Sequence, residues 1–137
     1  MKLPRGVAAF SLAVGACDAA TGLALIAAPL WTLGQMGIAA PPAEPVFLRW
    51  IGAFVLAVGL SYLYPFLLRD GGSARLGERL ATVFEVTTLA RALVALVAGA
   101  AIVGGLLERA WLGVPLFDAA VATAQIALLH RGGLRRD

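Results

Sequence analysis

The chain alternates four long apolar segments with short connections that are polar or rich in glycine and proline. Each apolar segment has about 20 residues, which is enough for an α-helix to cross a hydrocarbon core of roughly 30 Å. The pattern predicts four transmembrane helices, over about residues 7–28, 46–68, 80–104 and 111–129. Because no polar domain or long-period repeat interrupts them, we expect one membrane domain over residues 1–137, of the all-α class and built as a four-helix bundle.

The connections differ in the structure that they predict. Residues 29–45 contain several prolines and glycines, so we expect no long regular element there. Tyr62, Tyr64 and Pro65 near the end of the second span are typical of an aromatic belt at the membrane interface followed by a helix stop. The polar residues 69–79 predict a turn, because Gly71 and Gly72 interrupt a helix.

The first apolar segment requires a choice between a cleaved signal and a transmembrane helix. Residues 14–17 loosely resemble a lipoprotein cleavage box, and a short basic segment precedes them. The apolar run continues well past Cys17, which favours a transmembrane helix. The same cysteine is the only one in the chain, so we expect neither an internal disulfide nor a CxxC metal site.

Composition supports the membrane interpretation, and the distribution of charge gives an orientation. The chain is 61% hydrophobic and 14% charged, whereas soluble domains have roughly 45–50% apolar and about 25% charged residues. Despite the net charge of +3, the basic residues lie at helix ends and form no face with interleaved aromatic residues, so we expect no nucleic-acid partner. Two basic residues, Arg49 and Arg109, lie on one predicted side of the membrane. The other side carries Lys2, Arg5, Arg69, Arg75, Arg79, Arg131, Arg135 and Arg136.

This asymmetry predicts that both termini face the cytoplasm, because positive residues stay on the inner side. It also argues against a dual-topology exporter, which requires a near balance of charge between the two sides. The expected location is the bacterial inner membrane, with several passes and with the lipid bilayer itself as a partner.

Ionisable residues within the predicted spans are candidates for function, because they are expensive in hydrocarbon. Counting along the helices places Asp18, Arg91 and Asp118 at a similar depth of roughly 18 Å from the cytoplasmic side. We therefore expect Arg91 to pair across helices with one or both aspartates. Glu85 is not a helical neighbour of Arg91, since six residues correspond to about 120° of rotation. Thr88 lies three residues from both and is expected to bridge them by hydrogen bonds.

The other spans offer faces that suit a polar interior. Gly15, Asp18 and Gly22 share one side of the first helix, and small residues let helices approach closely. The second helix likewise presents Arg49, Gly52, Leu56 and Gly59, and the fourth presents Pro115, Asp118, Ala122 and Gln125. The candidate residues of a ligand-binding site or intramembrane ion network are Asp18, Arg49, Glu85, Thr88, Arg91, Asp118 and Gln125.

Three interpretations of this polar set stay open. It is a structural ion network, or a site that relays protons or holds a cation because carboxylates outnumber guanidinium groups, or a site in which Arg49 or Arg91 holds a polar head group. His130, the single histidine, is expected at the interface, and no second haem ligand accompanies it. No nucleophilic triad, phosphate loop or zinc motif is present in the sequence, so we predict no catalytic residue.

The segment Phe47–Leu60 (FLRWIGAFVLAVGL), with Arg91 in the third span and Asp118 in the fourth, resembles DoxX-like small four-helix bacterial membrane proteins. This resemblance implies an integral inner-membrane protein, in some cases associated with respiratory or redox complexes. The lack of cysteine pairs argues against a thiol-redox role.

These observations favour a non-catalytic accessory or scaffold subunit of a membrane complex. Its expected partners are other subunits or a second copy of the chain. We predict no dedicated cofactor; a lipid or quinone between the helices is the class of ligand that this interpretation admits. The alternative is a small transporter or proton-coupled channel that uses the intramembrane Asp/Glu/Arg set. An enzyme acting on a lipid-soluble substrate ranks third, because only the polar set supports it.

Overall fold

The described part of the chain is helical, with turns and short loops and no strands. The computed structural model describes residues 3–68, 72–131 and 134, except for the side chains of residues 73 and 74. The elements in chain order are α1 (Arg5–Ala27), α2 (Pro29–Gln35), α3 (Pro45–Leu67), α4 (Gly72–Val103), the short 3₁₀-helix η1 (Arg109–Leu112) and α5 (Gly113–His130). The stretches that are long and apolar enough to cross a membrane are Arg5–Ala27, Pro45–Leu67, Arg75–Val103 and Arg109–His130. The predicted all-α class and the four apolar helices are confirmed for these residues.

The largest difference from prediction is the beginning of α4. The helix starts at Gly72, which has a φ of +66°, whereas the apolar pattern places its start near residue 80. The turn predicted over 69–79 is therefore wrong for residues 72–79, and residues 69–71 lie outside the described part. The physical reason is that hydropathy marks the membrane-crossing portion of a helix. Arg75, Leu76 and Glu78 are good helix formers that extend α4 beyond it.

The remaining ends of the long helices lie within two residues of the predicted boundaries. The linker over 29–45 contains the seven-residue α2 and then an irregular segment, consistent with the absence of a long regular element. Pro29 occupies the first turn of α2, where its missing N–H is tolerated. Leu33 and Ile38 are buried and pack with Leu25 and Leu48, so the linker covers one end of α1 and α3.

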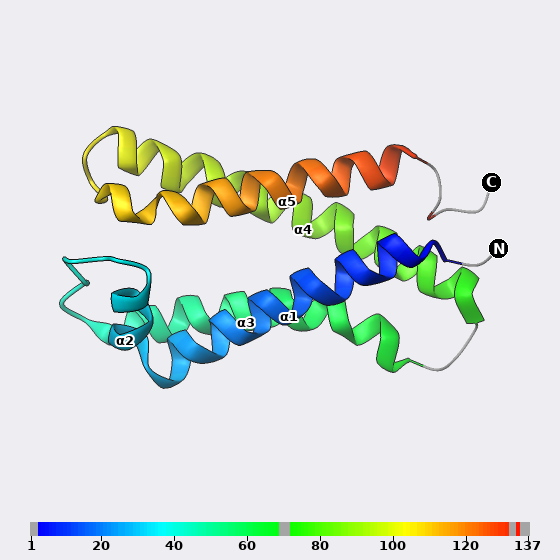
Figure 1. Cartoon of the computed structure of the whole chain (residues 1–137), viewed down its shortest axis with the longest axis horizontal. Helices are drawn as coiled ribbons and strands as arrows, with labels where there is room; N and C mark the ends of the chain where they lie inside the picture. Colours follow the sequence, from blue (N-terminus) through cyan, green and yellow to red (C-terminus); the bar gives the residue numbers. More distant parts are fainter. Residues whose placement is uncertain (1–2, 69–71, 132–133, 135–137) are drawn as a thin grey trace.

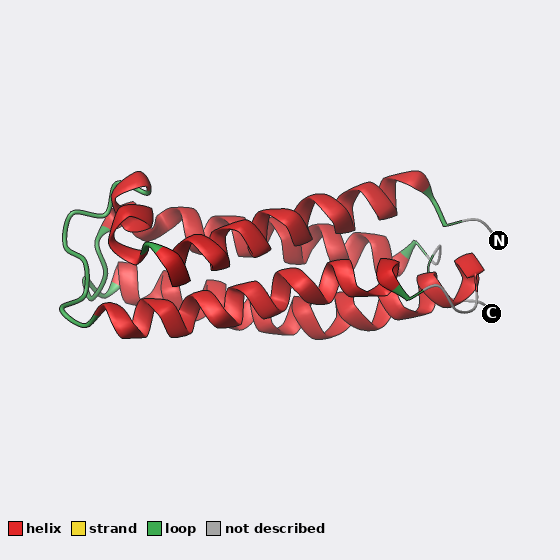
Figure 2. Ribbon diagram, turned by 90° about the horizontal axis from the view of Figure 1, so that it is seen from below, coloured by secondary structure: helices red, strands yellow, loops and turns green. Residues whose placement is uncertain are grey.

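The long helices form two antiparallel pairs, as Figure 1 shows. α1 packs along α3, and α4 packs along α5, with the closest packing inside each pair. The two chain termini lie at the same end of the molecule, and α2 and the α4–η1 connection lie at the other (Figure 1 and Figure 2). An even number of spans therefore returns the chain to the side from which it started.

Glycines hold α1 and α3 at short range. A Cβ added at Gly22 would lie 2.6 Å from the Gly52 carbonyl oxygen, and one added at Gly59 would lie 2.8 Å from the Gly15 carbonyl oxygen. In each helix the two glycines are seven residues apart, a spacing that returns to the same helix face. The small-residue faces recognised in the sequence thus face each other and allow backbone-to-backbone contact.

One apolar cluster joins the two pairs toward the end of the molecule where the termini lie. Leu80 and Phe84 of α4 pack with Val14 of α1, Tyr62 of α3 and Val121 of α5. At the opposite end, the Ala40 N–H donates to Glu108 Oε1 over 3.1 Å, which ties the linker to the α4–η1 connection. Between these ends lies the polar cluster described next.

Candidate functional site: a buried arginine that contacts all four long helices

Arg91 lies in the middle of α4 and is surrounded by the other three long helices. Its side chain is 5% exposed. Nη2 forms an ion pair with Asp18 Oδ2 of α1, and Nη1 forms one with Asp118 Oδ1 of α5 over 2.5 Å. The carboxylate side chains are 9% and 14% exposed, respectively. The three residues placed at one depth by counting along the helices are therefore in direct contact.

The fourth helix reaches Arg91 through Tyr62 of α3. Arg91 Nε–H donates a hydrogen bond to the Tyr62 hydroxyl over 3.2 Å. The guanidinium carbon also lies 5.5 Å from the centroid of the Tyr62 ring and 5.6 Å from that of Phe117, within the range of cation–π attraction. A single side chain thus links α4 to α1, α3 and α5.

Neutral polar groups continue the network from Tyr62. Its hydroxyl donates to Thr87 Oγ1 over 2.9 Å, and Thr87 in turn donates to the Val83 carbonyl over 2.7 Å. The Gln125 amide donates to Tyr62 over 2.7 Å and to Thr87 over 2.8 Å. Gln125 Oε1 accepts from the Thr88 hydroxyl over 3.2 Å. We call this set the Arg91 network; it comprises Asp18, Tyr62, Thr87, Thr88, Arg91, Asp118 and Gln125.

Within the part of the chain that the structure describes, every buried side-chain nitrogen and oxygen atom has a hydrogen-bond partner. Leaving such atoms unpaired inside an apolar bundle would be expensive. The network is therefore consistent with a closed structural unit that fixes how the two helix pairs meet. The same described residues contain no group of three or more His, Cys, Asp or Glu side chains placed to hold a metal ion.

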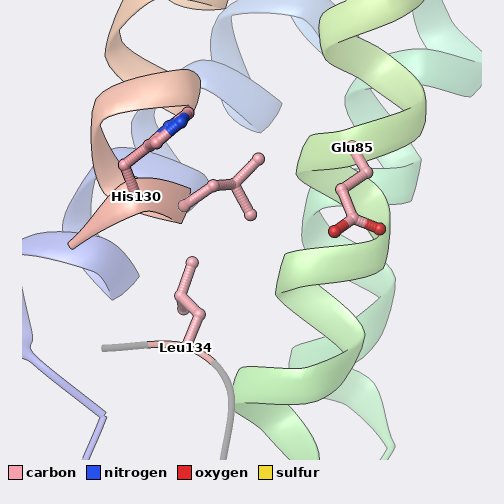
Figure 3. Close-up of a pocket in the computed structure, with 4 residues that line it drawn as sticks. Glu85, His130 and Leu134 are labelled. Carbon is pink, nitrogen blue, oxygen red and sulfur yellow. The ribbon is translucent and has the colours of Figure 1, made fainter. Parts of the chain in front are cut away.

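Two of the candidate residues lie away from this network. Arg49 is exposed, and its Nη1 donates to the Ile26 carbonyl in the last turn of α1. A cation at this position satisfies a terminal carbonyl and interacts favourably with the helix dipole. Glu85 is exposed on α4, and with His130 and Leu134 it lines a pocket of about 280 Å³ (Figure 3).

Thr88 belongs to the network through a different contact from the one expected. Its hydroxyl donates to Gln125 of α5, so it joins two helices instead of bridging Glu85 and Arg91 along one. The residue that shares Arg91's face one turn earlier is Thr87, which is buried and accepts from Tyr62. The role of Thr87 was readable from the sequence, because it lies four residues before Arg91. Residues four apart on a helix are neighbours, just as residues three apart are.

Tyr62 is the main residue that the sequence argument missed. The aromatic-belt assignment is wrong for it, since Tyr62 is 0% exposed, whereas Tyr64 is 58% exposed. The physical reason is helix phase: Tyr62 lies three residues after Gly59 and continues the glycine face of α3 into the bundle. The expected stop at Pro65 is also displaced slightly, because α3 continues to Leu67.

Comparisons with protein-family models, with curated proteins and with solved structures find no match for this chain. Its described architecture is that of an all-helical protein with four helices able to cross a membrane.

Proposed function

We propose that this protein is a non-catalytic, multi-pass protein of the bacterial inner membrane that serves as an accessory or scaffold subunit of a membrane complex. The observation that carries the proposal is the Arg91 network. One guanidinium joins all four long helices, and the buried polar atoms of the described chain are paired. Such closure suits a rigid structural unit better than a site that must open for turnover.

The exterior of α4 supports a contact role. The apolar part of α4 is less buried than the apolar parts of the other three membrane-crossing stretches. Leu89, Leu93 and Leu96 are exposed along it. Their spacing of four and three residues places them on one helix face. This face is available to lipid, to a quinone, or to a neighbouring subunit.

The orientation proposed is with both termini in the cytoplasm. The eight-to-two distribution of Lys and Arg supports it, and both termini lie at one end of the bundle. Reporter fusions test it: a fluorescent protein fused to either terminus should fluoresce, and alkaline phosphatase at the same positions should be inactive. Active phosphatase at either terminus would overturn this topology.

The accessory role is tested by native purification followed by mass spectrometry of co-purifying proteins and lipids. We expect a reproducible protein partner that is lost from Leu96→Trp on α4 and retained by Leu23→Trp. Leu23 is an exposed control on α1. If no protein partner co-purifies with the protein under native conditions, the accessory role is refuted.

A small transporter or proton-coupled channel is the second candidate, and the excess of carboxylates over guanidinium in the Arg91 network favours it. Purified protein in liposomes carrying a pH-sensitive dye distinguishes the two. Absence of proton or solute flux excludes the transport candidate, whereas flux that disappears in Asp118→Asn would replace the accessory proposal.

A further inference from the structure

The charges of the Arg91 network do not balance. α1 contributes Asp18, α5 contributes Asp118, and α4 contributes the single guanidinium of Arg91. α3 contributes the hydroxyl of Tyr62, which accepts from Arg91 and donates to Thr87. With both carboxylates ionised, the cluster would carry a net charge of −1.

Among the described residues, Arg91 is the only cation paired with Asp18 or Asp118. Glu85 lies six residues earlier on α4 and is exposed, outside the Arg91 network. Arg49 is exposed on α3 and donates to the Ile26 carbonyl. Cys17, next to Asp18 in sequence, is exposed.

The carboxyl groups have room for one more hydrogen. Asp18 uses Oδ2 and Asp118 uses Oδ1 to bind Arg91. Among the described residues, no donor is directed at Asp18 Oδ1 or Asp118 Oδ2, and these two oxygens are not among the fully buried atoms, all of which are paired. One carboxylate neutralises Arg91, and burying the charge of a second one in an apolar setting costs free energy. Taking up a proton removes that charge and its cost.

We infer that the Asp18/Asp118 pair binds one proton at neutral pH, so that the Arg91 network is electrically neutral. The proton belongs to the pair, because two carboxyl groups that share one guanidinium titrate together. This inference rests on the membrane-embedded bundle proposed above, but not on its accessory role.

Infrared difference spectroscopy of the protein in nanodiscs tests the inference directly. A protonated carboxylic acid has a carbonyl stretching band that a carboxylate lacks, and this band shifts in D₂O. Carboxyl groups in water are ionised at neutral pH. The wild-type protein should therefore show, at neutral pH, a carbonyl band that shifts in D₂O and reports buried acid, whereas the band of the lipid ester carbonyls does not shift. This measurement requires no variant to fold.

Three variants assign the band. Asp18→Asn and Asp118→Asn each leave one carboxylate for one guanidinium, so the band should be lost in both. Glu85→Gln is the matched control, because it removes an α4 carboxyl outside the network, and the band should persist. Loss in Glu85→Gln, or persistence in both Asn variants, would assign the proton elsewhere and overturn the inference.

A wild-type protein without the band overturns the inference as well. If that protein instead unfolds at a higher temperature in sodium or potassium than in a bulky organic cation, the missing positive charge is a bound metal cation. The partner and flux experiments do not affect this band, so failure of the proposed function and failure of the proton site are distinguishable.

Discussion

The contact between α1 and α3 predicts that adding one methyl group at Gly22 destabilises the protein. In Gly22→Ala the new Cβ would lie 2.7 Å from Leu56 Cα and 2.6 Å from the Gly52 carbonyl oxygen. Carbon atoms in contact prefer about 3.5–4.0 Å, so the overlap with Leu56 is about 1 Å. Because the atoms struck are backbone atoms, no side-chain rotation relieves the overlap, and the helices must move apart.

The chain provides a matched control in Gly99 of α4. A Cβ added there has no neighbouring atom within 4 Å. Both substitutions place alanine in a helix interior, which stabilises by roughly 0.5–1 kcal/mol relative to glycine. That contribution cancels between the variants. The remaining difference is the overpacking penalty of about 1–3 kcal/mol, which disfavours Gly22→Ala.

Unfolding in mixed micelles with increasing dodecyl sulfate measures this difference, followed by circular dichroism and by tryptophan fluorescence. We expect Gly99→Ala to unfold at the same or a higher dodecyl sulfate fraction than wild type, and Gly22→Ala at a lower one. If Gly22→Ala is as stable as Gly99→Ala, the backbone contact between α1 and α3 is absent and the reasoning fails.

Three further predictions use the same assay. Tyr62→Phe keeps the ring but removes a hydroxyl that joins three hydrogen bonds, so it should destabilise by about 1–3 kcal/mol; the exposed Tyr64→Phe should stay within about 0.5 kcal/mol, and equal effects would refute a special role for Tyr62. Arg91→Gln leaves two buried carboxyl groups without their cation and should cost about 3–5 kcal/mol, so a wild-type unfolding midpoint would contradict the network. Arg49→Gln loses one hydrogen bond at an exposed helix end and should cost no more than about 1 kcal/mol, and a larger loss would mean that Arg49 has a buried role.

The two carboxylate partners of Arg91 were predictable from the sequence, because helix rise alone converts residue number into depth. Asp18, Arg91 and Asp118 required no knowledge of packing beyond the requirement that buried charges find partners. The glycine faces were similarly readable, since Gly15 and Gly22, like Gly52 and Gly59, repeat at seven residues.

The side of its helix that a residue occupies, and the length of each helix, were harder to predict from the sequence. Tyr62 carries a polar tip on an apolar ring, which suits either the interface or a buried hydrogen bond, and only its position relative to Gly59 distinguishes the two. The first turns of α4 are polar, so hydropathy does not register them, although their residues favour a helix. Glu85 and Arg49 were grouped with the network on charge alone, and their exposure separates them from it.

The position of Arg91 in the third of four spans has a consequence for biosynthesis. The chain is made from its N-terminus, so α1 and α3 precede α4, and α5 follows it. In the membrane topology proposed above, Asp18 and Tyr62 are available when Arg91 enters the bilayer, but Asp118, Gln125 and Phe117 arrive only with the last helix. A chain truncated before α5 would leave Arg91 with Asp18 and Tyr62 but without Asp118 and Phe117, so half of its partners would be missing.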